Sequence, residues 1–178
     1  MGHPIRERVH CAEEEKQGGC DCPRQGRGDG KDTGSSWDSE TDLLKYLSCY
    51  STKLERLDVS DCAHLWKLRC HKCPLNNLNL RGCTNLQHLS CNGDRLDNLN
   101  VNGFAYLSYL NCAGNGLEQL DVSENPYLTY LNCANSKLGS LDLGNNTELR
   151  RLVCDDTVNV INCPENITND PSIFADDE

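Results

Sequence analysis

The sequence predicts a right-handed solenoid of about six short coils, with one parallel β ladder, tight turns on the convex side and little helix. Three observations lead to this fold class. Leucines recur in two blocks with a constant period, and the segments without this repeat, a Gly-rich charged one and an acidic one, lie at the two ends of the 178-residue chain. A cysteine recurs at the same 21-residue period, without insertion or deletion, at Cys49, Cys70, Cys91, Cys112, Cys133 and Cys154.

Each repeat contains two apolar blocks. The first has the pattern L-x-x-L-x-C, as in residues 107–112, and the second has the pattern L-x-x-L-x-V/L, as in residues 117–122. The L-x-C segment indicates a strand, because successive side chains of a strand point to opposite faces. So short a unit leaves little room for a helix, and we therefore expect the second block to be extended or to form tight turns.

The repeat divides the chain into three parts. Residues 1–41 are predicted to be a flexible, Gly-rich, charged head that includes the start of a cap, because they carry too few large apolar side chains to offset the entropy lost on ordering. Residues 42–163 are predicted to form the solenoid. Residues 164–178 are predicted to form an acidic C-terminal cap and tail, in which two prolines occur.

The sixth repeat departs from the period after Cys154. Deleting one residue there brings Val158, Ile161 and Cys163 into the L-x-x-L-x-V/L spacing. We therefore expect these three side chains to close the core and the last coil to end near residue 163.

Charge is distributed unevenly along the chain. Residues 1–41 hold six basic and nine acidic side chains. Residues 155–178 hold seven acidic side chains and no basic one, and the body between these two segments holds eleven of each kind. Nucleic-acid binding requires Lys and Arg that neutralise phosphates, so a neutral body with acidic ends predicts no nucleic-acid partner. No run of about 18 apolar residues occurs, so we expect no membrane insertion. The N-terminal residues contain no apolar segment of the kind that marks a secretion signal, so we predict none in this chain.

The repeat unit matches the leucine-rich repeat pattern, with Cys in the third apolar position. The segment "LNCAGNGLEQLDVSENPYLTYL" resembles the short bacterial repeats of the internalin J type, which carry a stacked cysteine ladder. The resemblance covers roughly residues 42–163 and implies adhesin- or internalin-like recognition of another protein, secreted or at the cell surface, without catalysis or cofactor. One departure lies in the position that usually holds Asn, which is occupied here by Thr52, Cys73, Asp94, Asn115, Ser136 and Thr157.

We expect the six repeating cysteines to form a buried structural ladder. Stacked strands lie about 4.8 Å apart, and Cys is a small hydrophobe that fits the interior of a short coil. A disulfide between neighbouring coils is disfavoured, because it needs Cβ atoms about 3.8 Å apart. The ladder thiols should therefore be free.

The outward side chains of the predicted strands form the candidate binding face. One column is aromatic or cationic in every coil, and two neighbouring columns add further basic groups. Tyr and Arg are enriched in recognition surfaces. We expect the tyrosines of this column to be exposed, so that replacing them should leave the fold nearly intact. We therefore predict another protein as the partner and the following contact residues: Tyr46, Lys67, Arg69, His71, His88, Tyr109, Tyr130 and Arg151.

A cluster of cysteines and histidines suggests a metal site as an alternative. The segment from Cys70 to Cys73 has the C-x2-C spacing of metal sites. The repeat nevertheless accounts for nearly every cysteine nearby, so we predict no metal ligand in the solenoid. The residues considered were Cys62, His64, Cys70, His71, Cys73, Cys83, His88 and Cys91; in the head, Cys11, Cys20 and Cys22 are left open between oxidation and metal binding.

Catalytic motifs are absent from the sequence: there is no Ser/His/Asp arrangement, phosphate-binding loop or H-E-x-x-H segment. We therefore expect a protein that is not an enzyme. Beside protein recognition, two alternatives stay open. The many thiols and the missing secretion signal favour an intracellular scaffold or a structural subunit of a larger assembly, and the Cys/His cluster leaves a metal-binding protein as the other.

Overall fold

The structure is a computed structural model that describes residues 44–49 and 53–167. These residues contain ten strands of three residues each and no helix, and hence no helix able to cross a membrane. The predicted head, residues 1–41, lies outside the described residues, as does most of the predicted tail.

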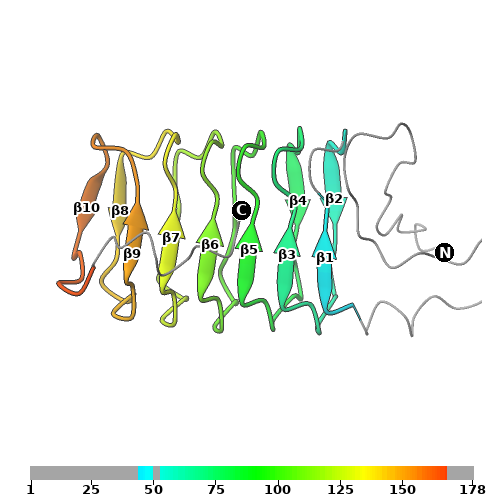
Figure 1. The fold of residues 1–178 in the computed structure, drawn as a ribbon, viewed down its shortest axis with the longest axis horizontal. Coiled ribbons are helices and arrows are strands. Elements are labelled where there is room, and N and C mark those ends of the chain that lie inside the picture. Colours follow the sequence, from blue (N-terminus) through cyan, green and yellow to red (C-terminus); the bar gives the residue numbers. More distant parts are fainter. Residues whose placement is uncertain (1–43, 50–52, 168–178) are drawn as a thin grey trace, which may run out of the picture.

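One six-stranded parallel sheet runs along the long axis of the molecule (Figure 1). Each strand pairs with the equivalent strand of the next coil, so that Leu68 lies opposite Leu89 and Leu89 opposite Leu110. The predicted solenoid is therefore confirmed, with six coils marked by this sheet. Its strands are β1 (Tyr46–Ser48), β3 (Lys67–Arg69), β5 (His88–Ser90), β6 (Tyr109–Asn111), β7 (Tyr130–Asn132) and β9 (Arg151–Val153).

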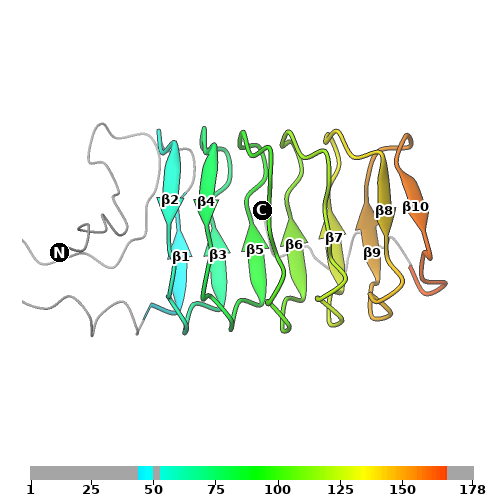
Figure 2. The same ribbon diagram turned by 180° about the vertical axis from the view of Figure 1, so that it is seen from behind.

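The returning half of each coil is mostly extended, with short strand pairs at the two ends of the array. Near the N-terminal end, β2 (Arg56–Asp58) pairs with β4 (Asn77–Asn79), and near the C-terminal end β8 (Ser140–Asp142) pairs with β10 (Asn159–Ile161). Both pairs are parallel, and Figure 2 shows them from behind. The expectation of extended segments and tight turns in the second block is met.

The core consists of stacked leucine columns. Leu68, Leu89, Leu110 and Leu131 are fully buried in the main sheet, and the other leucine columns pack against them across the coil. Full burial of one such side chain contributes about 1.5–3 kcal/mol. Each coil is too thin to bury its apolar side chains alone, so stability depends on contact with the neighbouring coils.

Turn side chains satisfy buried carbonyl groups of the preceding coil. In the position that leucine-rich repeats usually fill with Asn, the Asn115 Nδ2 donates hydrogen bonds to the carbonyl oxygens of Cys91, at 2.8 Å, and Cys112, at 3.0 Å. Cys73 occupies the same position and donates its Sγ–H to the carbonyl of Cys49 at 3.6 Å. In both cases the acceptor in the preceding coil lies 24 residues before the donor in the sequence. At these two positions the turn side chain thus donates to the preceding coil.

A second set of such donors lies at the turns before three of the main strands, β5, β7 and β9. The Asn125 Nδ2 donates to the carbonyl of Val101, and the Asn146 Nδ2 to that of Val122. The Cys83 Sγ–H donates to the carbonyl of Val59 at 3.1 Å, again 24 residues earlier. This set of donors was not predicted from the sequence, although its residues fall in one column of the repeat.

The last coil differs from the prediction. Val158 is buried as expected, but Ile161 is 42% exposed and Cys163 is also exposed. The reason is the register, because Val160 lies opposite Leu141 in the β10–β8 pair. The chain is therefore two residues shorter than the period here, and not one, so that Val160 takes the inward position expected for Ile161.

The described chain stays attached to the last coil beyond the predicted end at residue 163. The side chain of Ile167 packs against the core, and the Asn166 Nδ2 donates to the Thr147 carbonyl at 3.2 Å. Residues 164–167 therefore cover the C-terminal end of the leucine columns.

Candidate protein-recognition face

The main sheet places the predicted column of outward side chains in one continuous line. Strand pairing sets each member opposite the next, from Tyr46 through to Arg151. We call this line the aromatic row; its members are Tyr46, Lys67, His88, Tyr109, Tyr130 and Arg151.

Three rings of the aromatic row form a stack. The centroids of His88 and Tyr109 lie 4.0 Å apart with 4° between their planes, and those of Tyr109 and Tyr130 lie 4.4 Å apart with 3°. The Arg151 guanidinium lies 5.7 Å from the Tyr130 ring centroid, within cation–π distance. The stack forms because neighbouring strands lie about 4.8 Å apart, close to the separation of stacked rings.

The stacked tyrosines are much less exposed than expected. Tyr109 is 8% and Tyr130 is 7% exposed, whereas Tyr46 at the N-terminal end of the row is 37% exposed. The predicted register is correct, but both faces of each central ring are covered by a neighbouring ring or guanidinium. The central tyrosines are therefore packed into the face, and the expectation that they are exposed is wrong.

Basic groups flank the stack on the N-terminal coils. Lys67, Arg69 and His71 are half-buried on and after β3. Partial burial, together with the charges of Lys72 and Arg69, lowers the pKa of His71 below its ordinary value. His71 is thus mainly neutral at pH 7, and Lys67 and Arg69 provide the charge of this part of the face.

Acidic side chains are nearly absent from the described part of this face. The three outward columns are the aromatic row and the positions two and four residues after each of its members. Among their described residues only Asp155 is acidic. Its carboxylate accepts hydrogen bonds from the main-chain N–H groups of Asn135, at 3.0 Å, and Ser136, at 3.2 Å. The face is therefore cationic and aromatic in a chain whose net charge is −10.

The cysteine ladder lies on the opposite, inward side of the same strands. Five of its members are buried and Cys154 is half-buried, and none of the six forms a disulfide: Cys49, Cys70, Cys91, Cys112, Cys133 and Cys154. Burial raises the pKa of Cys70, Cys91 and Cys112, and it raises that of Cys133 to about 12. These thiols are protonated at pH 7 and act as packing groups.

The Cys/His cluster does not converge on one point. Cys73 and Cys83 direct their Sγ–H groups to main-chain carbonyls, and His64 is exposed on a turn. Within residues 44–49 and 53–167, no group of three or more His, Cys, Asp or Glu side chains is arranged to hold a metal ion.

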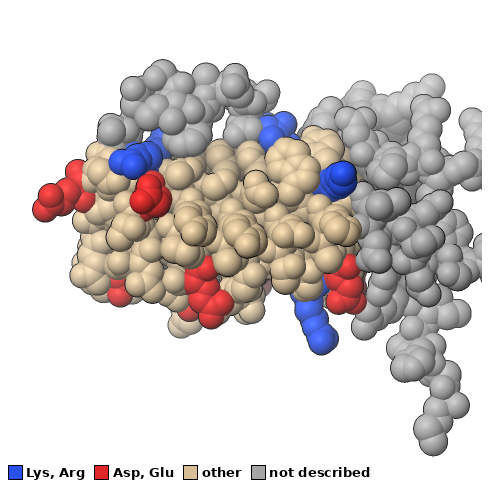
Figure 3. Space-filling view, turned by 90° about the horizontal axis from the view of Figure 1, so that it is seen from below, with Lys and Arg blue, Asp and Glu red and all other residues tan. Residues whose placement is uncertain are grey.

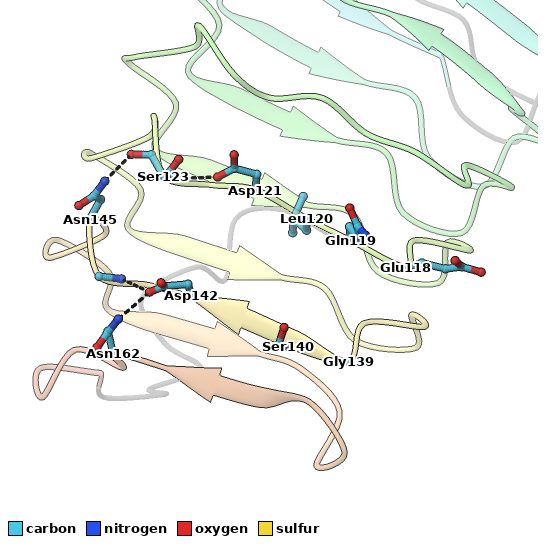
Figure 4. A pocket seen from close by; sticks show the side chains of 11 residues that line it. Glu118, Gln119, Leu120, Asp121, Ser123, Gly139, Ser140, Asp142, Asn145 and Asn162 are labelled. Carbon is cyan, nitrogen blue, oxygen red and sulfur yellow. Dashed lines mark hydrogen bonds between the residues drawn. The ribbon is translucent and has the colours of Figure 1, made fainter.

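A pocket lies on the returning side of the C-terminal coils (Figure 4). Its most prominent polar groups are turn carboxylates: Asp142 Oδ1 accepts the Gly144 N–H and the Asn162 Nδ2, both at 2.9 Å. These bonds lower the pKa of Asp142, and the Ser123 N–H has the same effect on Asp121. The carboxylates stabilise the turns of successive coils, and the pocket is lined by Glu118, Gln119, Leu120, Asp121, Ser123, Gly139, Ser140, Asp142, Gly144, Asn145 and Asn162.

Exposed aromatic side chains that were not predicted lie on the turns before the main strands. Tyr106 and Tyr127 are 56% and 57% exposed on consecutive coils, and Trp66 is 43% exposed. Figure 3 looks onto this edge and shows a central area without charged side chains. Tyr106 and Tyr127 are one period apart in the sequence, so aligning the turn residues by the repeat would have placed them side by side.

No protein-family model matches the chain, and no curated protein matches it. Among solved structures, the functional domain of InlJ from Listeria monocytogenes, described as including a cysteine ladder, superposes with a TM-score of 0.62 at 39% sequence identity. The match covers 64% of this chain and 26% of that chain. The chain therefore resembles the cysteine-ladder repeats of internalin J in both fold and sequence, as its 21-residue unit predicts.

Proposed function

We propose that this chain is a non-catalytic module that recognises another protein through the outward face of its main sheet. The aromatic row carries the proposal, because it forms one uninterrupted line of rings and cations over six coils. Five steps of about 4.8 Å give the row a length of about 24 Å. A surface of this length, held rigid by stacking, suits an extended protein segment.

The charge of the face indicates the chemistry of the partner. Lys67, Arg69 and Arg151 supply cations, and the one described acid of the three columns, Asp155, is engaged by main-chain N–H groups. Complementary charge favours association and register. The proposed partner therefore presents acidic side chains, accompanied by apolar or aromatic groups that contact the exposed ring of Tyr46.

The resemblance to internalin J supports the same class of function. The matched structure is described as a functional domain, and this chain spans about a quarter of that protein chain. By this resemblance we propose a secreted or cell-surface setting for the recognition module.

The test is a binding assay with matched charge variants. Lys67→Gln with Arg69→Gln removes two cations from the face, whereas Lys137→Gln with Arg81→Gln removes two exposed cations from turns. A partner retained stoichiometrically by the wild type should be lost by the first variant and kept by the second. Retention by both variants, or no retention by the wild type above a heat-denatured control, would contradict the proposal.

A further inference from the structure

In the column of turn residues that contains Cys73 and Asn115, one position holds an aspartate. In its ionised form an aspartate cannot donate a hydrogen bond as those two neighbours do. Asp94 lies between Cys73 and Asn115 in the column of turn residues that donate hydrogen bonds to the preceding coil. Asn115 donates from its amide and Cys73 from its thiol. An ionised carboxylate has no hydrogen to donate.

The surroundings of Asp94 are buried and incompletely bonded. The residue is 6% exposed, and its Oδ1 accepts the Cys73 N–H at 2.7 Å. Its Oδ2 is buried and accepts no hydrogen bond from the described residues. A buried polar atom without a partner destabilises the fold, and a buried charge destabilises it more.

Within the described part of the chain, no cation compensates a charge at this position. The titratable groups that interact electrostatically with Asp94 are the thiols of Cys70 and Cys91, whose pKa values are raised by burial. The next coil presents the neutral amide of Asn115, which donates to the Cys91 carbonyl. Lys72 and Arg95, the cations of the adjacent turns, are exposed to solvent.

The repeat supplies the acceptor that a protonated Asp94 would use. Donors in this column reach the carbonyl 24 residues earlier, which is Cys49 for Cys73 and Cys91 for Asn115. The same offset from Asp94 gives the carbonyl of Cys70. We propose that Asp94 is a neutral carboxylic acid in the folded chain, donating its O–H to the Cys70 carbonyl, and that its ionisation loosens the contact between the second and third coils.

The pH dependence follows from this arrangement. Burial raises the pKa of Asp94 from 3.8 to about 7, although the Cys73 N–H opposes the shift. Between these two values the folded state binds a proton that the unfolded state has released, so stability falls as pH rises. The contribution is fully present below about pH 4 and is lost by about pH 7, with a change in the folding equilibrium constant approaching tenfold per pH unit between about pH 5 and 6.5.

Two measurements test the proposal. The Cγ chemical shift of Asp94, followed by ¹³C NMR, should titrate near neutral pH. Urea unfolding of the wild type and Asp94→Asn between pH 5 and 8 should show a stability difference that grows with pH, because the amide donates at every pH. Asp142→Asn, a change at an exposed turn carboxylate with a lowered pKa, should show no such growth in this range.

Either of two results would overturn the proposal: a Cγ titration midpoint near 4, or a difference between wild type and Asp94→Asn that does not change with pH. Asn115→Asp provides an independent positive result. It places a second acid in the column and should make stability fall more steeply with pH than in the wild type.

Discussion

The rings of Tyr109 and Tyr130 stack with centroids 4.4 Å apart, although the two residues belong to different coils. Strand pairing brings the two main chains to nearly the same separation, so stacking and sheet formation favour the same register. The rings that the sequence presents as contact residues are thus also part of what aligns the coils.

Replacing Tyr130 by Ala should cost about 2–4 kcal/mol of unfolding free energy, because it removes a buried ring and its stacking partner contact. Tyr127→Ala, at a neighbouring position that is 57% exposed, should change stability by about 0.5 kcal/mol or less. Urea denaturation followed by circular dichroism measures both. Equal losses for the two variants would show that the stack contributes nothing to stability.

Gly82 and Gly103 occupy equivalent turns, and both have a φ of 83°. A Cβ at Gly82 would lie 2.9 Å from the Asp61 carboxylate and 3.0 Å from the Asp61 Cα, whereas a Cβ at Gly103 would meet nothing within 4 Å. Gly103→Ala should therefore cost only the backbone strain, about 1–2 kcal/mol. Gly82→Ala should cost at least about 1 kcal/mol more, because the main chain of Asp61 must move. Thermal melts of the two variants compare them directly, and a smaller loss for Gly82→Ala would refute the clash.

Asn125→Ala should destabilise the fold by about 1–3 kcal/mol, since it removes two buried hydrogen bonds from the Asn125 Nδ2 to the carbonyls of Val101 and Phe104, which keep a main-chain N–H donor each. The control is Asn145→Ala, which removes an exposed hydrogen bond to the Ser123 carbonyl and should cost less than about 1 kcal/mol. Chemical denaturation of the two variants gives the comparison. A loss at Asn145 as large as that at Asn125 would contradict the role of the second set of donors.

The ladder thiols should react slowly in the folded protein. Their burial blocks access and raises their pKa, and the thiolate is the reactive form. Native alkylation followed by mass spectrometry should label the exposed Cys163 before Cys70, Cys91, Cys112 and Cys133, which should react only as the chain unfolds. Fast labelling of all four ladder residues, or their recovery in stoichiometric disulfides, would refute this prediction.

A fragment reduced to two coils, such as residues 107–148, should fail to unfold cooperatively. Each coil buries its leucines against its neighbours, so two coils leave half of these contacts exposed to water. Circular dichroism melts of this fragment and of residues 42–167 test the point. A sharp transition in the short fragment would mean that single coils are more self-sufficient than their burial indicates.

The fold could be predicted from the sequence because one period fixes every register. Once Cys91 and Cys112 are aligned, Leu89 must lie opposite Leu110 and His88 opposite Tyr109, as the pairing shows. The outward face was therefore predictable residue by residue, and so was the inward position of the cysteines.

What the period could not provide was the contact between side chains. It places Tyr109 and Tyr130 on one face, but the closeness of their rings depends on rotamers, and so their burial was missed. The inward position of Val160 instead of Ile161 follows from how the chain closes the last coil. The donor role of Asn125 became visible only when its distance to the Val101 carbonyl was known.

The unbroken 21-residue offset gives the molecule a modular length. Strand pairs, ring stacks and turn hydrogen bonds all join a coil to its immediate neighbours, so an internal coil could be duplicated or removed without altering the bonding pattern of the others. A face built this way grows in increments of about 4.8 Å. The length of a bound partner that the face can contact is consequently a whole number of coils. Selection can adjust that length by copying or deleting the stretch of coding sequence that specifies one coil.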